Sequence, residues 1–168
     1  MRSKLVLTGG LVAAAFIAAA CSTTSSSGLY GAPSAAPTAP PVAAAPAASG
    51  IAIKVGTTKV GQVLVDSNGQ TVYLFLADNG ATSSCNSASC VQYWPPVLTN
   101  GAPQAGAGVN ASLLGTLTRA DQTIQVTYAG HPLYRFISDK MAGDATGQGL
   151  NAFGAPWYVV SPSGALIR

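Results

Sequence analysis

One block of residues occurs twice in this chain and limits how the chain can fold. The first copy reads GQTVYLFLAD, from Gly69 to Asp78, and the second reads GHPLYRFISD, from Gly130 to Asp139. Both copies keep a glycine, an aliphatic residue, Tyr, Phe and Asp at the same spacing. Such a pattern predicts either one structural unit used twice or one site built twice.

Each copy follows a turn signal and is predicted to be the outgoing strand of a β-hairpin. The turn before the first copy is Ser67-Asn68-Gly69, and the turn at the start of the second is Ala129-Gly130. Asn-Gly and Ala-Gly supply the positive φ that tight turns require. A third hairpin is predicted around Pro162-Ser163-Gly164.

Alternation along each strand predicts which side chains share a face. Tyr73 and Phe75 point to one side, with Leu74 on the other, so the first copy is apolar on both faces and is expected to be a central strand. In the second copy, the residue between the two aromatics is Arg135. A charged residue there indicates a face that is partly exposed to water.

Residues 51–168 have the pattern of an all-β domain. Short apolar runs are separated by Gly, Asn, Asp and Pro at close intervals, and helical periodicity is weak. The stretch is long enough for one domain with its own core. We expect mostly antiparallel hairpins in one compact domain made of two related repeat units. The segment 111–117, capped by Asn110, has the pattern of a short helix.

The first 20 residues have the pattern of a secretory signal peptide. Arg2 and Lys4 precede an uncharged apolar stretch that is shorter than the roughly 20 residues a membrane-spanning helix needs. Small residues then lead to Cys21, as in the lipobox of bacterial lipoproteins, where the cysteine carries lipid. Because Ala18 stands where Leu is preferred, cleavage that releases a secreted protein is the alternative.

Residues 21–50 are expected to form a disordered linker after the anchor. They are mostly Ala, Pro, Ser and Thr and contain no charged residue, so they have little to bury. Once the signal is removed, the remaining Lys and Arg nearly balance the Asp residues, and the chain has no Glu. Without a basic patch, nucleic acid is not expected as a partner.

The two remaining cysteines, Cys85 and Cys90, are expected to pair with each other. Outside the cytoplasm such a pair is normally oxidised. The intervening CNSASC segment is polar and short, so the bridge is predicted to be a local staple without redox function.

The chain resembles the predicted bacterial lipoproteins with a repeated Tyr-x-(Phe/Trp/Tyr)-x-x-Asp motif, the secreted repeat family of unknown function. The motif falls on both blocks, and CNSASCVQYWPPV and GDATGQG followed by WYVVSPSG resemble further segments of that family. The resemblance implies an extracytoplasmic location but no activity, since the family has none established. The residues that match the motif are Tyr73, Phe75, Asp78, Tyr134, Phe136 and Asp139.

The sequence does not favour an enzyme, a metal site or a cofactor. His131 is the only histidine, it lies at a hairpin tip, and no Gly-x-Ser-x-Gly motif is present. Asp78 and Asp139 are the one candidate for a hydrolase, as paired carboxylates, but each is well placed to accept backbone N–H bonds in a turn. Cys85, Cys90 and His131 lack a fourth zinc ligand.

A binding or structural role in the cell envelope is the function that we predict. Trp94, which precedes a Pro-Pro step, and His131 form the candidate ligand surface, with a cell-wall glycan or an envelope protein as partner. The alternative is a redox or cofactor-binding accessory protein. Most of the aromatic residues are expected to be core; those in the domain are Tyr73, Phe75, Tyr93, Trp94, Tyr128, Tyr134, Phe136, Phe153, Trp157 and Tyr158.

Overall fold

The computed structural model describes residues 50–168. The predicted signal peptide, Cys21 and the linker up to residue 49 lie outside the described residues. The described part contains mostly strands, with one α-helix and one 3-10 helix, which confirms the predicted fold class. The elements are β1 (Ala52–Thr58), β2 (Gly61–Asp66), β3 (Tyr73–Phe75), α1 (Ala88–Tyr93), β4 (Gln104–Ala105), η1 (Ala111–Leu113), β5 (Leu114–Thr118), β6 (Ile124–Tyr128), β7 (His131–Pro132), β8 (Asn151–Ala152) and β9 (Ala155–Val159).

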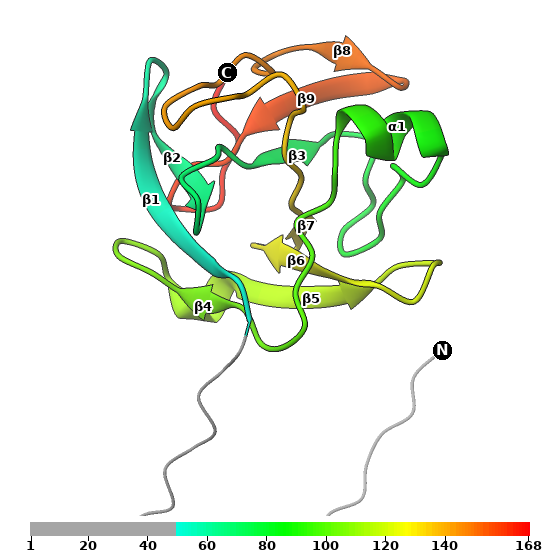
Figure 1. Cartoon of the computed structure of the whole chain (residues 1–168), viewed down its shortest axis with the longest axis horizontal. Coiled ribbons are helices and arrows are strands. Elements are labelled where there is room, and N and C mark those ends of the chain that lie inside the picture. Colours follow the sequence, from blue (N-terminus) through cyan, green and yellow to red (C-terminus); the bar gives the residue numbers. More distant parts are fainter. Residues whose placement is uncertain (1–49) are drawn as a thin grey trace, which may run out of the picture. The chain divides into compact units, whose positions relative to one another are not determined.

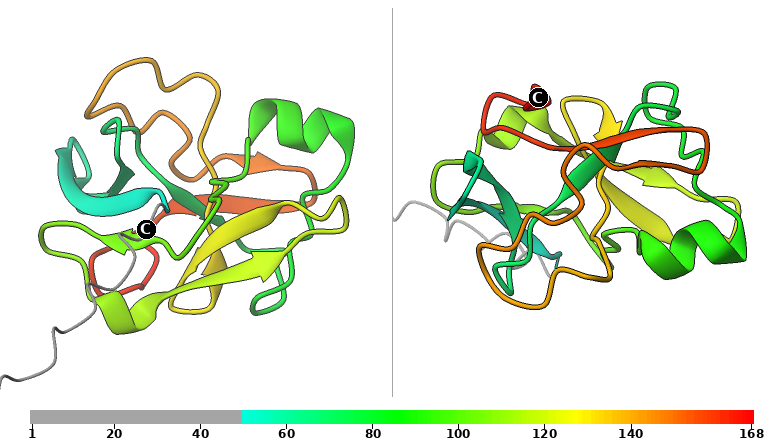
Figure 2. Two further views of the ribbon diagram at one scale, coloured as in Figure 1. Left: turned by 60° about the horizontal axis from the view of Figure 1, so that its bottom comes forward. Right: turned by 90° about the horizontal axis from the view of Figure 1, so that it is seen from above.

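The strands form three small sheets of three strands each. Their orders are β2-β1-β4, β3-β9-β8 and β5-β6-β7, and Figure 1 shows how the three sheets are arranged around one another. Among the described residues, the short pairing of β1 with β4 is parallel and the other ladders are antiparallel. Sheets this small cannot bury a full face alone, and they share two clusters of buried side chains. Figure 2 shows the sheets from two further directions.

The hairpin predicted at Ala129-Gly130 is present as β6 and β7. Ala129 and Gly130 have φ of 50° and 81°, the two positive values of a type I′ turn. The two strands pair with each other up to this turn, with Tyr128 opposite His131. Around Pro162-Ser163-Gly164 the chain also turns back, and Val160 bridges Leu166.

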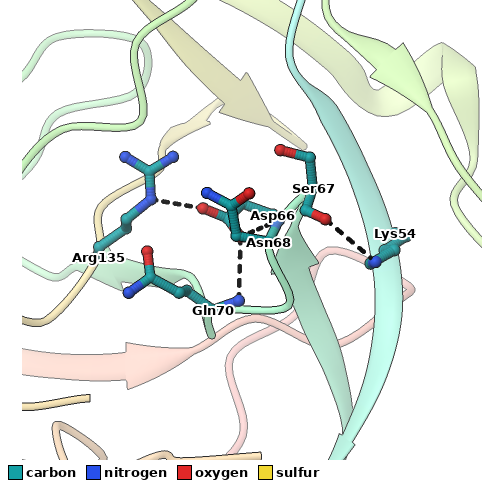
Figure 3. Close-up of polar contacts among 6 residues, drawn as sticks. All are labelled: Lys54, Asp66, Ser67, Asn68, Gln70 and Arg135. Atoms are coloured by element: carbon teal, nitrogen blue, oxygen red, sulfur yellow. Dashed lines mark hydrogen bonds and ion pairs between the residues drawn. The ribbon is translucent and has the colours of Figure 1, made fainter. Parts of the chain in front are cut away.

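The first predicted hairpin has its turn, but its two strands do not pair with each other over a ladder. β2 pairs with β1 and β3 pairs with β9, and one isolated bridge links the two arms. The buried Asp66 carboxylate accepts the backbone N–H groups of Asn68 and Gln70 at 2.9 and 3.0 Å, and Arg135 Nε lies 2.6 Å away (Figure 3). These bonds close the loop on the aspartate and tie it to Arg135 of the second block.

Two short helices differ from the sequence prediction. The segment around Ala88, expected to be a flexible polar loop, forms α1, with Ser87 Oγ accepting the N–H of Cys90 as an N-cap. The segment 111–117 is helical only over η1, which Asn110 caps, and it then extends as β5. A serine two residues after a cysteine is a weak helix signal, so the sequence does not predict α1.

The core consists of two clusters of buried side chains. Tyr73, Phe75, Tyr134 and Trp157 belong to one cluster, whereas Leu74 belongs to the other. The alternation along β3 therefore places side chains in both clusters, as predicted. The strand is not central, however, because it lies at the end of the sheet β3-β9-β8. The block tyrosines and phenylalanines meet in the first cluster, whereas the shared aliphatic position, Val72 and Leu133, lies in the second.

Candidate functional site

The two blocks meet at their tyrosines. Tyr73 N donates to Tyr134 O over 2.8 Å, and Tyr134 N donates to Tyr73 O over 3.0 Å, which makes an antiparallel bridge. Each tyrosine thus lies opposite its own counterpart. The two blocks are related by a local two-fold axis at this bridge.

The aspartates that end the blocks bind across this axis. Tyr73 Oη donates to Asp139 Oδ2 at 2.6 Å, and Tyr134 Oη donates to Asp78 Oδ2 at 2.9 Å. Each tyrosine therefore binds the aspartate of the other block. This exchange does not follow from sequence spacing, because the two members of each pair are 66 and 56 residues apart.

Each carboxylate also holds the loop that follows its own block. Asp78 Oδ1 accepts the N–H of Ser84 at 2.7 Å. Asp139 Oδ1 accepts the N–H and the hydroxyl of Thr146 at 2.9 and 2.6 Å. The structure thus gives each aspartate a tyrosine and a loop as partners, and both of its oxygens are used.

The electrostatics of these pairs favour neutral tyrosines. Burial raises the pKa of Tyr73 above its usual range, and the Asp139 carboxylate raises it further. Burial likewise raises the pKa of Tyr134, with Asp78 adding to the effect. Burial also raises the pKa of Asp78, although the N–H of Ser84 and the Tyr134 hydroxyl lower it. At neutral pH the phenols are donors.

Four aromatic rings form a continuous stack beside these pairs, in the order Phe75, Trp157, Trp94 and Phe136. Successive ring centroids are 4.0, 4.0 and 4.4 Å apart, with interplanar angles of 8°, 4° and 28°. The phenylalanine of each block stacks on the tryptophan that follows the other block. The block tyrosines meet the two indoles edge-on, at 5.3 and 5.1 Å.

Trp94, which was predicted to be an exposed part of the ligand surface with His131, is buried. Its side chain is 1% exposed, because the chain turns inward after α1 and the indole enters the aromatic stack. A Pro-Pro step does keep this segment out of a regular ladder, but it does not turn the preceding side chain outward. His131 is half-buried in β7, at the hairpin tip.

Cys85 and Cys90 form the predicted disulfide. Both side chains are buried, at 1% and 2% exposure, and Cys90 lies within α1. The bridge therefore holds the helix against the first core cluster.

An exposed aromatic groove lies between the end of α1 and the β8–β9 hairpin. The cavity has a volume of about 290 Å³, and we call it the aromatic groove; its lining is Tyr93, Trp94, Phe136, Leu150, Ala152 and Phe153. Tyr93, Leu150 and Phe153 are 51%, 40% and 42% exposed. The rings of Tyr93 and Phe153 stand 6.3 Å apart and are tilted by 40°. Phe136, at one end of the stack, is the only residue of the repeated motif in this lining.

Phe153 is held in the groove by an unusual turn. Its φ is 58° and that of Gly154 is 99°, and together they connect β8 to β9. A bulky side chain rarely adopts positive φ, which favours Gly or Asn. Strain of this kind often marks a functional position.

The groove arises where the two repeats differ. Trp94 follows Tyr73 by 21 residues, whereas Trp157 follows Tyr134 by 23 residues, and this longer segment contains Phe153. At the other end of the stack, Phe75 is 2% exposed. The sequence signal for this site was an aromatic residue directly before a hairpin glycine.

Two other properties bear on the site. Among residues 50–168, no three His, Cys, Asp or Glu side chains gather as a group that could hold a metal ion. Within the same residues, no helix is both long and apolar enough to cross a membrane.

Comparison with known proteins agrees with the internal symmetry. The family model described as a secreted repeat of unknown function matches residues 54–98 and 115–161. The first match contains one block with Trp94, and the second contains the other block with Trp157. Neither a curated protein nor a solved structure matches the chain. Because the two matches cover more than half of its length, the chain belongs to the secreted repeat family of unknown function.

Proposed function

We propose that this protein is a lipid-anchored binding module of the bacterial cell envelope and that the aromatic groove is its ligand site. Membership of a secreted repeat family supports the extracytoplasmic location. The lipid anchor is inferred from Cys21, which follows a short apolar leader and small residues.

The exposed aromatic groove is the observation that carries the proposal. Aromatic side chains dominate binding surfaces because each buries a large apolar area with few freely rotating bonds. Here Tyr93 and Phe153 remain exposed, although three of the four rings of the stack are buried and Phe136 is half-buried. The positive φ of Phe153 adds backbone strain that packing alone does not explain.

The groove favours an uncharged apolar segment of an envelope protein as its occupant. Its lining carries no charged residue, and its only polar side-chain atoms are Tyr93 Oη and Trp94 Nε1. A glycan needs several hydrogen bonds to its hydroxyl groups, and this lining supplies few. An apolar segment loses little on leaving water and gains contact with the rings.

A binding role is also better supported than catalysis or redox chemistry. The two motif aspartates, the candidate acid–base pair, each bind a tyrosine and a loop. The Cys85–Cys90 disulfide is buried, which favours a structural bridge over an exchanging one.

Site-specific photo-crosslinking in intact cells tests the proposal. A benzophenone amino acid replaces Tyr93 in the groove, and the same group at the exposed Ile124, outside the groove, is the control. We expect an adduct at position 93 that is absent at position 124 and is lost when Phe153→Ala is added.

Mass spectrometry of that adduct then identifies the occupant. Attachment to an uncharged apolar peptide supports the proposal in full. Attachment to glycan keeps the groove as the site but overturns the choice of occupant. Equal labelling from positions 93 and 124, or none from position 93, overturns the proposed site.

A further inference from the structure

A second site is indicated at Arg119, away from the residues that line the aromatic groove. Arg119 directly follows β5, and its side chain is buried, with 4% of the residue exposed. Its two terminal nitrogens donate four hydrogen bonds, to Ser83 Oγ, Gln125 Oε1, Cys85 O and Asn86 Oδ1, at 2.6 to 3.0 Å. All four acceptors are neutral.

No carboxylate pairs with this buried cation. The one ion pair among residues 50–168 joins Arg135 to Asp66. The nearest carboxylate in the hydrogen-bond network of Arg119 is Asp78, reached through Ser83 Oγ and Tyr134 Oη. Arg119 Nε has no partner among the described residues. A buried guanidinium ordinarily has an anion beside it, because removing its charge from water is costly.

A polar cavity of about 170 Å³ adjoins this guanidinium. Arg119 lines it together with Thr82, Ser83, Asn86 and Thr118. The Thr82 and Thr118 hydroxyls can donate hydrogen bonds to an anion, whereas the Asn86 amide already donates to Ser83 O. The guanidinium makes the electrostatic potential of the cavity positive. The volume is sufficient for one small oxyanion.

We propose that this cavity binds a small anion with a carboxylate or phosphate group. The Arg119 charge supplies the attraction, and the hydroxyls of the two lining threonines supply hydrogen bonds. Asp78 and the exposed Asp121 are the acidic groups within electrostatic reach of Arg119, and both weaken the field that an entering anion meets. This inference does not depend on the proposed function of the groove.

Nuclear magnetic resonance on the full chain tests the site with acetate and with inorganic phosphate. Ionic strength is kept constant with a bulky sulfonate buffer. We expect saturable shifts of the Arg119 Nε–H resonance and of the Thr82 and Thr118 amides. Saturation by acetate alone identifies a carboxylate site, saturation by phosphate alone identifies a phosphate site, and either result supports the proposal.

Variants separate binding from a purely structural role of Arg119. Thr118→Val removes a lining hydroxyl and is expected to weaken binding, whereas Thr116→Val, on the same strand but outside the cavity lining, is the matched control. Asp78→Asn removes a nearby negative charge and is expected to tighten binding about threefold. Arg119→Lys loses the planar donor set and is expected to weaken binding about tenfold or more.

The outcomes that overturn the proposal do not require Arg119→Lys to fold. The proposal is overturned if the shifts saturate with neither acetate nor phosphate. Equal effects of Thr116→Val and Thr118→Val, or unchanged affinity in Asp78→Asn, do so as well. Arg119 is then a clamp that holds the disulfide loop and nothing more.

Discussion

The Tyr73 hydroxyl donates to the buried carboxylate of Asp139 over 2.6 Å, although the two residues belong to different repeats. Tyr134 of the second repeat donates the corresponding bond to Asp78 of the first. The repeated motif is therefore a pair of clasps that lock one repeat to the other. Neither repeat can complete its own clasp, which explains why the same residues occur twice.

Removing either tyrosine hydroxyl is expected to destabilise the fold. Tyr73→Phe leaves a buried Asp139 oxygen and the Gly147 N–H without their partner, at a cost of about 1 to 3 kcal/mol. Tyr93→Phe, at a tyrosine that is 51% exposed, is the control and is expected to change stability little. Urea unfolding measures both variants. Equal stability of Tyr73→Phe and wild type would show that the clasp adds nothing.

The clasps also predict a loss of stability in alkali. The folded-state pKa of Tyr73 and Tyr134 is raised above the unfolded value of about 10. The stabilisation is therefore complete below pH 10 and is lost as pH rises toward the folded-state pKa. The free energy of unfolding of the wild type, measured from about pH 8 to about pH 11, should therefore fall as the pH rises above about 10. The free energy of unfolding of the double variant Tyr73→Phe/Tyr134→Phe should fall much less over the same range. An equal fall in both proteins contradicts the assignment of this pH dependence to the two tyrosines.

The two block phenylalanines are expected to differ in their contribution to stability. Phe75 is 2% exposed and stacks on Trp157, so Phe75→Ala should cost about 3 to 5 kcal/mol. Phe136 is half-buried in the wall of the groove, so Phe136→Ala should cost less. Thermal melts rank the two, with Leu98→Ala at an exposed position as reference. If Phe136→Ala lowers the melting temperature more than Phe75→Ala does, the groove end of the stack contributes more to stability than the buried end.

Phe153 is expected to trade stability for binding. Asn adopts positive φ more readily, so Phe153→Asn should raise stability by about 1 kcal/mol while the groove loses a ring. Denaturant midpoints and crosslinking from position 93 measure the two effects. A lower midpoint in this variant indicates that the ring stabilises the fold and that the turn stores no strain for binding.

Cys21 is expected to carry lipid. Cells fed a labelled fatty acid should incorporate label into the wild-type protein but not into Cys21→Ser. The second variant, Ala18→Leu, restores the preferred lipobox residue and should be labelled at least as well as wild type. A mature chain that begins after residue 21 rules out the anchor and supports free secretion.

Much of the fold was predictable because it depends on neighbours in sequence. Alternation placed Tyr73 and Phe75 together, and the turn at Ala129-Gly130 has the backbone that its glycine suggested. Trp94 shows the limit of such reasoning. A Pro-Pro step constrains the backbone around it, but whether the indole faces water depends on Trp157, which is far along the chain.

The sequence by itself determined the all-β class, the repeated motif and the Cys85–Cys90 pair, because periodicity, turn residues and short loops are local properties of the chain. Only the tertiary structure decided which tyrosine binds which aspartate, because the two-fold arrangement brings together residues that sequence spacing cannot relate. The same holds for the groove beside Phe153 and for the buried charge of Arg119. Both result from side chains that converge from separate strands and loops, where burial sets the energetic value of each contact.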